Sequence, residues 1–138
     1  MITGDLENIT LGNRIPKDFF IAKGIGESDI AVHAGSYHLA LKAAGIECYN
    51  HLVYSSILPS IACEIKRPDN YMHGSVAEGI QARADVAQGQ RATAAIIYGW
   101  LIDKKTEKKY GGLVCEYGAQ GTMKEAEESL QASLQELY

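Results

Sequence analysis

Two adjacent serines, Ser55 and Ser56, stand at the end of a short apolar run. The run reads NHLVYSSILP over residues 50–59, so that a strand-like stretch ends at two hydroxyls and Pro59 stops it. Because proline does not continue the interior of a strand, the serines are predicted to lie on a sharp turn. Hydroxyls at such a turn either cap backbone groups or serve as reactive groups, and the pattern alone fits both roles.

Other reactive residue types are scattered along the chain. No His-x-x-x-His or Cys-x-x-Cys spacing occurs, so no metal site is predicted. The histidines are His33, His38, His51 and His73. The Gly24-x-Gly26 pair lacks the third glycine of a dinucleotide-binding loop, and a small nucleotide-binding protein is therefore an alternative that the motif supports only in part.

The three cysteines, Cys48, Cys63 and Cys115, are odd in number and lie far apart. We interpret them as free thiols, two of them in apolar surroundings where a buried thiol packs as a small apolar side chain, as in a protein of the cytoplasm. Residues 1–13 carry acidic residues and no apolar core, so they are not read as a secretory signal.

Composition excludes further classes of protein. The chain has 138 residues, of which 46% are hydrophobic and 22% charged, as in a soluble protein with one domain over residues 1–138. Its net charge of -4 and the lack of a basic stripe argue against nucleic-acid binding. The longest apolar stretch, residues 94–102, is too short to cross a bilayer, so no membrane association is expected.

The elements that position the serines begin with a loosely held arm over about the first 15 residues. A short strand is predicted over residues 19–22. Apolar residues at three- and four-residue spacing then predict a helix over residues 30–44, with Gly45 as its C-cap. A strand over residues 48–53 leads directly into Ser55.

After the serines the pattern favours strands. Two are predicted at residues 75–84 and 92–103, joined by a turn near residues 88–90. A hairpin turn at residues 104–109 leads into a strand over residues 113–117. We therefore expect mainly antiparallel pairing in this half of the chain.

The chain ends in a predicted helix. Thr122 and Glu125 have the spacing of a capping box. The apolar stripe comprises Met123, Ala126, Leu130, Leu134 and Leu137. Strands outnumber helices, which predicts an α+β fold: an αββα sandwich of mainly antiparallel sheets with outer helices.

The run at residues 50–59 resembles the cleavage site of the pyruvoyl-dependent arginine decarboxylases: an asparagine, apolar residues, Ser/Thr-Ser, an aliphatic pair and proline. Three more segments are similar to that family in the same order. They are GIGESD at 24–29 before the first helix, HGSVAE at 73–78 after the cleavage loop, and GGLVCEY at 111–117, which holds the catalytic acid. The resemblance covers most of residues 16–137.

The resemblance implies a self-processing decarboxylase that converts arginine to agmatine and CO2, on a route to polyamines. The Ser56 hydroxyl attacks the carbonyl of Ser55 to form an ester, and elimination then cuts the chain into residues 1–55 and 56–138. Hydrolysis of the resulting dehydroalanine leaves a pyruvoyl group and ammonia. This ketone accepts the electrons that decarboxylation leaves behind, so neither pyridoxal phosphate nor a metal is expected.

The resemblance also assigns roles to single residues. Asn50 donates to the developing oxyanion or holds the turn, and the alternative is that it bonds its own strand end. Glu116 is the proton donor, for which we expect burial to raise the pKa, the alternative being a solvated carboxylate. Ser55 and Ile57 flank the reactive group in the substrate site. The family forms trimers with active sites between subunits, so a homotrimer is expected.

Two features depart from the family. His38 stands on the first predicted helix where arginine-specific members have an aspartate, and a neutral imidazole cannot replace a carboxylate–guanidinium pair. Glu47 is the nearest acid that can take over; otherwise the substrate is not arginine, and a histidinium suits an acidic side chain. His38 as an ordinary helix residue also stays open. In addition, the family continues beyond the final helix, whereas this sequence stops at Tyr138.

A second class of function remains alongside the enzyme. A non-catalytic homologue would keep the fold but act, uncleaved, as a structural or binding partner. The two readings differ in one observation, because a self-processing chain yields two bands on a denaturing gel and an inert homologue yields one.

Overall fold

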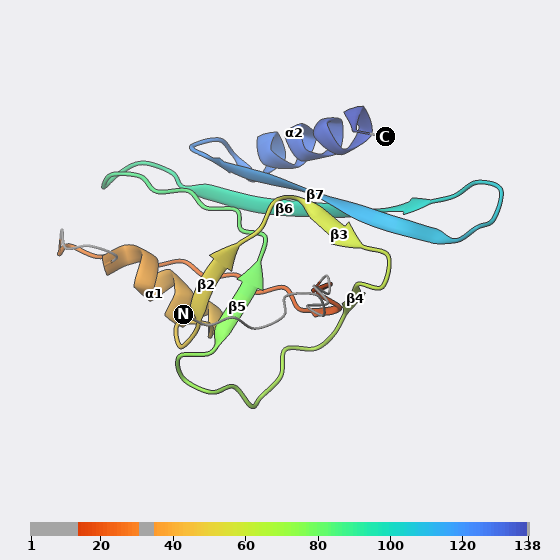
Figure 1. Ribbon diagram of the computed structural model, residues 1–138. Helices are drawn as coiled ribbons and strands as arrows, with labels where there is room; N and C mark the ends of the chain where they lie inside the picture. Colours follow the sequence, from red (N-terminus) through yellow and green to blue (C-terminus); the bar gives the residue numbers. More distant parts are fainter. Residues whose placement is uncertain (1–13, 31–34, 138) are drawn as a thin grey trace, which may run out of the picture.

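The fold of the chain is α+β, as seen in a computed structural model that describes residues 14–30 and 35–137 (Figure 1). The elements in chain order are β1 (Asp18–Phe19), α1 (Gly35–Ala44), β2 (Asn50–Val53), β3 (Ile57–Pro59), β4 (Cys63–Glu64), β5 (Val76–Gly79), β6 (Thr93–Ile102), β7 (Lys109–Ala119) and α2 (Met123–Glu136). None of the described helices is long and apolar enough to cross a membrane.

The largest sheet has the strand order β3-β7-β6 and is antiparallel throughout. The long strands β6 and β7 form the predicted hairpin. Asp103 fixes its turn, because its carboxylate accepts the backbone N–H groups of Lys105 at 2.9 Å and Thr106 at 2.7 Å. These backbone hydrogen bonds also lower the pKa of Asp103.

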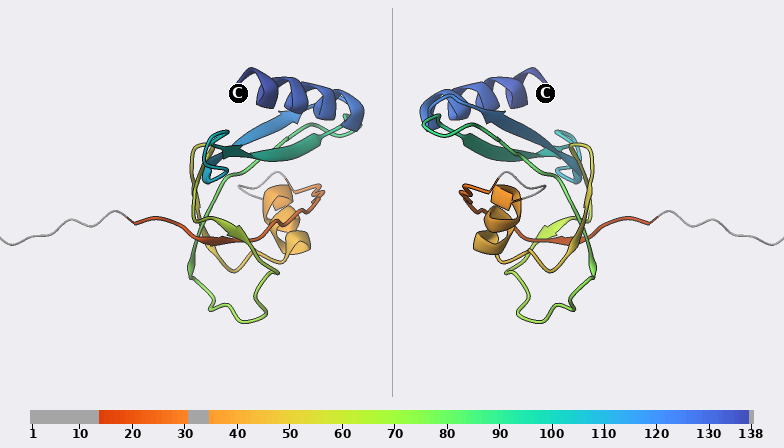
Figure 2. Two further views of the ribbon diagram at one scale, coloured as in Figure 1. Left: turned by 90° about the vertical axis from the view of Figure 1, so that its right-hand side faces the viewer. Right: turned by 90° about the vertical axis from the view of Figure 1, so that its left-hand side faces the viewer.

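Helix α2 covers one face of the β6–β7 hairpin (Figure 2). The predicted capping box is present at its start, where the Thr122 side chain accepts the N–H of Glu125 and the Glu125 carboxylate accepts the N–H of Thr122. The buried apolar side chains among the described residues are Ala62, Val114, Cys115, Ala126 and Leu130. Ala126 and Leu130 lie on α2, which packs on β6 and β7.

Two small parallel strand pairs, β1–β4 and β2–β5, accompany the main sheet. The sequence had indicated that β5 pairs with β6, and this was wrong: β5 pairs with β2, Asn50 opposite Val76. The backbone groups of β5 are thereby satisfied by a strand far away in sequence, which local patterning does not reveal. The αββα sandwich is not confirmed, and only the three-stranded sheet has the expected antiparallel pairing.

Helix α1 lies on the opposite side of the main sheet from α2 in every view (Figures 1 and 2). It ends as predicted at Gly45, whose φ of +69° suits glycine. The extended segment at Gly24 and Gly26 runs against its backbone, and a Cβ at either position would collide with the carbonyls of Ala40 or Ser36. These two glycines therefore serve close packing. Residues 31–34 of the predicted helix, and residues 1–13 of the predicted arm, lie outside the described residues.

Candidate active site

Ser56 occupies the sharp bend between β2 and β3, and β7 fixes its position. Strand β3 pairs with β7 from Ile57 onward, and the pairing is extended by a bond from the N–H of Val114 to the carbonyl of Ser56, at 2.9 Å. The turn that the sequence predicts is thus present. It holds the backbone of Ser56 against the middle of the longest strand.

The Ser56 hydroxyl meets the carboxylate of Glu116, 60 residues away in sequence. Its Oγ donates to the Glu116 Oε1 at 2.9 Å and lies 3.2 Å from Oε2. The contact follows from the register, because Ser56 is opposite Val114 and side chains alternate along a strand, so that Glu116 is the diagonal neighbour on the same face. A hydroxyl that points at a carboxylate can pass its proton to it.

The carbonyl of Ser55, on the other side of the bend, also has a partner. It accepts a hydrogen bond from the backbone N–H of Ile57 at 2.9 Å. The bond spans two residues and closes a γ-turn centred on Ser56. All three predicted residues from Ser55 to Ile57 therefore belong to one compact unit with Glu116.

Asn50 does not lie in this cluster. It is at the other end of β2 from Ser55, where its side-chain Nδ2 donates to the carbonyl of Gly74 at 2.8 Å. Its backbone N–H donates to Ser75, also at 2.8 Å. Asn50 thus fastens the start of β2 to the segment that leads into β5.

The two candidate partners of the substrate side chain are also outside the cluster. His38 is exposed on α1. Glu47 is half-buried between α1 and β2, and its Oε2 has no hydrogen-bond partner in the described part of the chain. No hydrogen bond joins either residue to Ser56 or Glu116 within the described residues.

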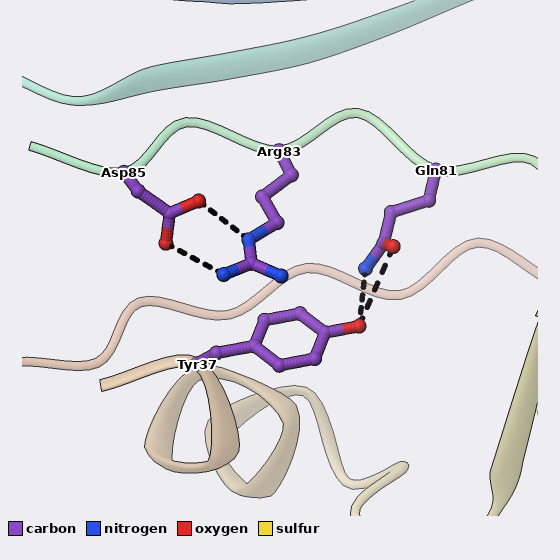
Figure 3. Close-up of polar contacts among 4 residues, drawn as sticks. All are labelled: Tyr37, Gln81, Arg83 and Asp85. Carbon is purple, nitrogen blue, oxygen red and sulfur yellow. Dashed lines mark hydrogen bonds and ion pairs between the residues drawn. The ribbon is translucent and has the colours of Figure 1, made fainter. Parts of the chain in front are cut away.

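A polar network ties α1 to the segment between β5 and β6 (Figure 3). The guanidinium of Arg83 stacks 4.0 Å from the centre of the Tyr37 ring and forms a two-point ion pair with Asp85. The Asp85 hydrogen bond is the main cause of a raised Arg83 pKa. Gln81 donates to the Tyr37 hydroxyl at 2.9 Å. The network thus joins α1, on which Tyr37 precedes His38, to residues 81–85.

A second polar cluster supports the chain just before the bend, and sequence reasoning missed it. Arg14 pairs with Glu78 on β5 and donates to the Tyr54 hydroxyl at 2.9 Å. The Tyr54 N–H donates to Gly79 at 2.8 Å. The sequence carries no signal for this contact, because 40 residues separate Arg14 from Tyr54.

Burial differs between the two neighbours on β7. Cys115 is buried, and desolvation followed by the charge of Glu116 raises the pKa of its thiol. Cys115 therefore stays protonated as a packing residue. Glu116 itself is exposed, so the burial that the sequence analysis expected for it is not supplied within one chain.

Metal ligands do not gather at this place. Among residues 14–30 and 35–137, no group of three or more His, Cys, Asp or Glu side chains is arranged to hold a metal ion. The donors near the bend are a serine hydroxyl, one carboxylate and backbone groups. Such a set suits proton transfer and acyl chemistry at a backbone carbonyl.

A scan of family models identifies the class of protein that has this arrangement. The model of the pyruvoyl-dependent arginine decarboxylases (PvlArgDC) matches residues 18–138. The chain belongs to this family, and the family implies a pyruvoyl prosthetic group and decarboxylase chemistry. A search of the curated proteins found no match.

Proposed function

We propose that this protein is a self-processing decarboxylase that makes its pyruvoyl group from Ser56 and converts arginine to agmatine and CO2. The observation that carries the proposal is the hydrogen bond from the Ser56 hydroxyl to Glu116 at the bend after β2. Membership of the family supports pyruvoyl chemistry, and the family's name supports arginine as the substrate.

The residues at the bend suit the first step of maturation. Glu116 takes the hydroxyl proton as the Ser56 Oγ bonds to the carbonyl carbon of Ser55. The C–N bond between the two serines then breaks, and the nitrogen of residue 56 takes up a proton. The product is an ester that joins the Ser55 carbonyl to the former Ser56 hydroxyl, with a free amine on residue 56.

A second step removes the ester. A base takes the Cα proton of residue 56, the Ser55 carboxylate leaves, and residue 56 becomes a dehydroalanine. Water then replaces the amino nitrogen, which departs as ammonia. Glu116 lies beside the leaving oxygen and is the side chain placed to serve as this base.

The pyruvoyl group supplies an electron sink for decarboxylation. The chain's contribution to turnover is a proton: Glu116 stands beside residue 56, where it can protonate the substrate's α-carbon once CO2 has left. This step needs a carboxyl that holds its proton, which burial favours.

A homotrimer is the proposed source of that burial. Large apolar side chains next to the bend are exposed in the single chain, including Val53 at 62% and Ile57 at 65%. An exposed apolar surface of this kind is typical of a subunit contact. A neighbouring subunit that covers β2, β3 and β5 would enclose Glu116 and complete the substrate site.

The test of this proposal is the mass of the purified chain. We expect two fragments, 1–55 and 56–138, the second with a blocked N-terminus. Ser56→Ala should stay intact because no nucleophile remains, and Ser56→Thr should be cut slowly. A wild-type chain that stays whole after long incubation would instead indicate a non-catalytic homologue.

Substrate choice needs a separate measurement on the processed protein. Release of CO2 is compared for arginine, lysine, ornithine, aspartate and glutamate. Arginine is expected to react fastest. A preference for an acidic amino acid would make His38 a charged substrate contact and contradict the arginine assignment.

A further inference from the structure

The carbonyl that Ser56 attacks already has a hydrogen-bond donor. The Ile57 N–H lies 2.9 Å from the Ser55 oxygen across the γ-turn. Ser56 is not among the residues with positive φ, so the turn is of the inverse form that is common where strands begin. The donor is thus in place without unusual backbone strain.

The register of β3 explains why this N–H is free to face Ser55. In an antiparallel pair, residues that exchange hydrogen bonds alternate with residues that do not. The bond from Val114 to the Ser56 carbonyl marks a bonded position, so Ile57, which faces Leu113, is a non-bonded one. Its N–H points away from β7, on the open side of an edge strand.

The side chain that resemblance suggested for this task is occupied elsewhere. The Asn50 carboxamide donates to Gly74 at the far end of β2. Among the described residues, the hydrogen bond that reaches the Ser55 carbonyl is the one from Ile57. Ser56 is therefore fixed by three bonds, through the carbonyl before it, its own carbonyl and its hydroxyl.

We infer that the backbone N–H of Ile57 is the oxyanion donor for self-cleavage, an inference that rests on the proposed maturation at Ser56. As the Ser56 Oγ bonds to the Ser55 carbon and its proton passes to Glu116, the carbonyl π electrons move onto the Ser55 oxygen. The Ile57 N–H, which lies 2.9 Å from this oxygen in the resting chain, then donates to the oxyanion. When the C–N bond breaks, the charge returns from the oxygen and the nitrogen is protonated.

The decisive experiment removes this one N–H. The α-hydroxy analogue of isoleucine at position 57 replaces the 56–57 amide with an ester, which keeps the side chain and deletes the donor. Loss of one oxyanion donor typically slows a reaction about 10²–10³-fold, and we expect a decrease of that order in the rate of cutting between Ser55 and Ser56. Mass spectrometry follows the cleavage.

The matched control is the same replacement at Val114, which removes the bond to the Ser56 carbonyl but keeps the Ile57 N–H. It should be cut much faster than the variant at position 57. Equal slowing in both proteins would show that anchoring of β3 is what matters and would overturn the inference.

Ile57→Pro gives a second, fully genetic test. An edge strand accepts proline where the N–H faces away from its partner, so the fold should persist, as checked by circular dichroism. Hydroxylamine, which cleaves esters, should not speed up chain cutting, because the block precedes ester formation. Rapid cutting by hydroxylamine would place the block later and contradict the proposed role.

The outcomes separate the inference from the function on which it rests. A wild-type chain that is never cut contradicts both the proposed self-processing and the role of the Ile57 N–H. If the wild-type chain is cut and the ester variant at position 57 is cut equally fast, only the role of the Ile57 N–H is contradicted.

Discussion

In the proposed function, the contact between Ser56 and Glu116 gives one carboxyl two tasks. We propose that Glu116 accepts the hydroxyl proton during maturation and later supplies a proton to the substrate. Both proposed tasks take place next to residue 56, which the Glu116 carboxylate contacts. A change at Glu116 should therefore affect the two reactions together.

Glu116→Gln keeps the size of the side chain but can neither take nor give the proton. We expect slower cutting at Ser56 and, in protein that has matured fully, a loss of turnover of about 10²–10⁴-fold. Mass spectrometry measures the first effect and CO2 release the second. Glu136→Gln, on the exposed face of α2, is the charge-matched control. Processed Glu116→Gln with near wild-type turnover would remove this residue from the mechanism.

Asn50→Ala tests the structural role that the contact with Gly74 gives this residue. Loss of a single hydrogen bond should lower the free energy of unfolding by about 0.5–1.5 kcal/mol. Urea denaturation in a Ser56→Ala background measures this without interference from cleavage. The rate of cutting, measured with Ser56 intact, should stay close to wild type. Slow cutting at unchanged stability would instead indicate that Asn50 donates to the Ser55 carbonyl during cleavage.

Among the elements, those with strong local signals were predictable from the sequence. The capping box at Thr122, the glycine that ends α1 and the β6–β7 hairpin each depend on residues that are close together in the chain. The parallel pairing of β2 with β5 was not predictable. Nothing near residues 76–79 distinguishes a distant partner from the next strand along the chain.

The candidate site also has a part that the sequence predicted and a part that it did not. Ser55 and Ser56 stood out by their place at the end of an apolar run, and Glu116 by its resemblance to a family segment. That the two meet depends on the β3–β7 register, which joins residues 60 apart. The donor from Ile57 is a backbone group and leaves no trace in residue identity.

The capping box of α2 gives a prediction at the scale of one helix. Thr122→Ala should lower the free energy of unfolding by about 1 kcal/mol, because the N–H of Glu125 loses its acceptor. Thermal unfolding of the Ser56→Ala protein measures this effect. Thr122→Ser, which keeps the hydroxyl, is the control and should stay near the parent.

The same box makes α2 sensitive to acid. Hydrogen bonds from the Thr122 backbone and side chain lower the pKa of Glu125 below its usual 4.5 in the folded chain. Its stabilising effect is therefore present above the unfolded pKa and is lost as the pH falls through the lower folded value. Glu125→Gln should flatten the change in stability below about pH 4.5. An unchanged pH profile would contradict the assignment.

At the scale of the whole molecule, few large side chains are buried among residues 14–30 and 35–137 of the single chain. The buried apolar side chains among the described residues are Ala62, Val114, Cys115, Ala126 and Leu130, whereas Leu52 on β2 and Val76 on β5 are exposed at 52% and 58%. Burial of such surface is the main driving force of association. The surface around β2 and β5 is accordingly the one we expect to meet another subunit.

Sedimentation should give three times the mass of the chain. Val76→Asp places a charge on this surface and should shift the protein toward monomers, with circular dichroism unchanged. Tyr110→Ser, an exposed position on β7, is the control for loss of an apolar side chain. A wild-type monomer at high concentration would contradict the trimer.

The two small parallel pairs have a consequence for the proposed cut between Ser55 and Ser56. Each pair joins a strand before residue 55 to a strand after residue 56: β1 to β4 and β2 to β5. The contact from Tyr37 to Gln81 crosses the same boundary. A cut at the bend would therefore separate the two polypeptides covalently but leave their strands paired. The ends released at Ser55 and residue 56 could then move apart locally while the rest of the subunit stays assembled.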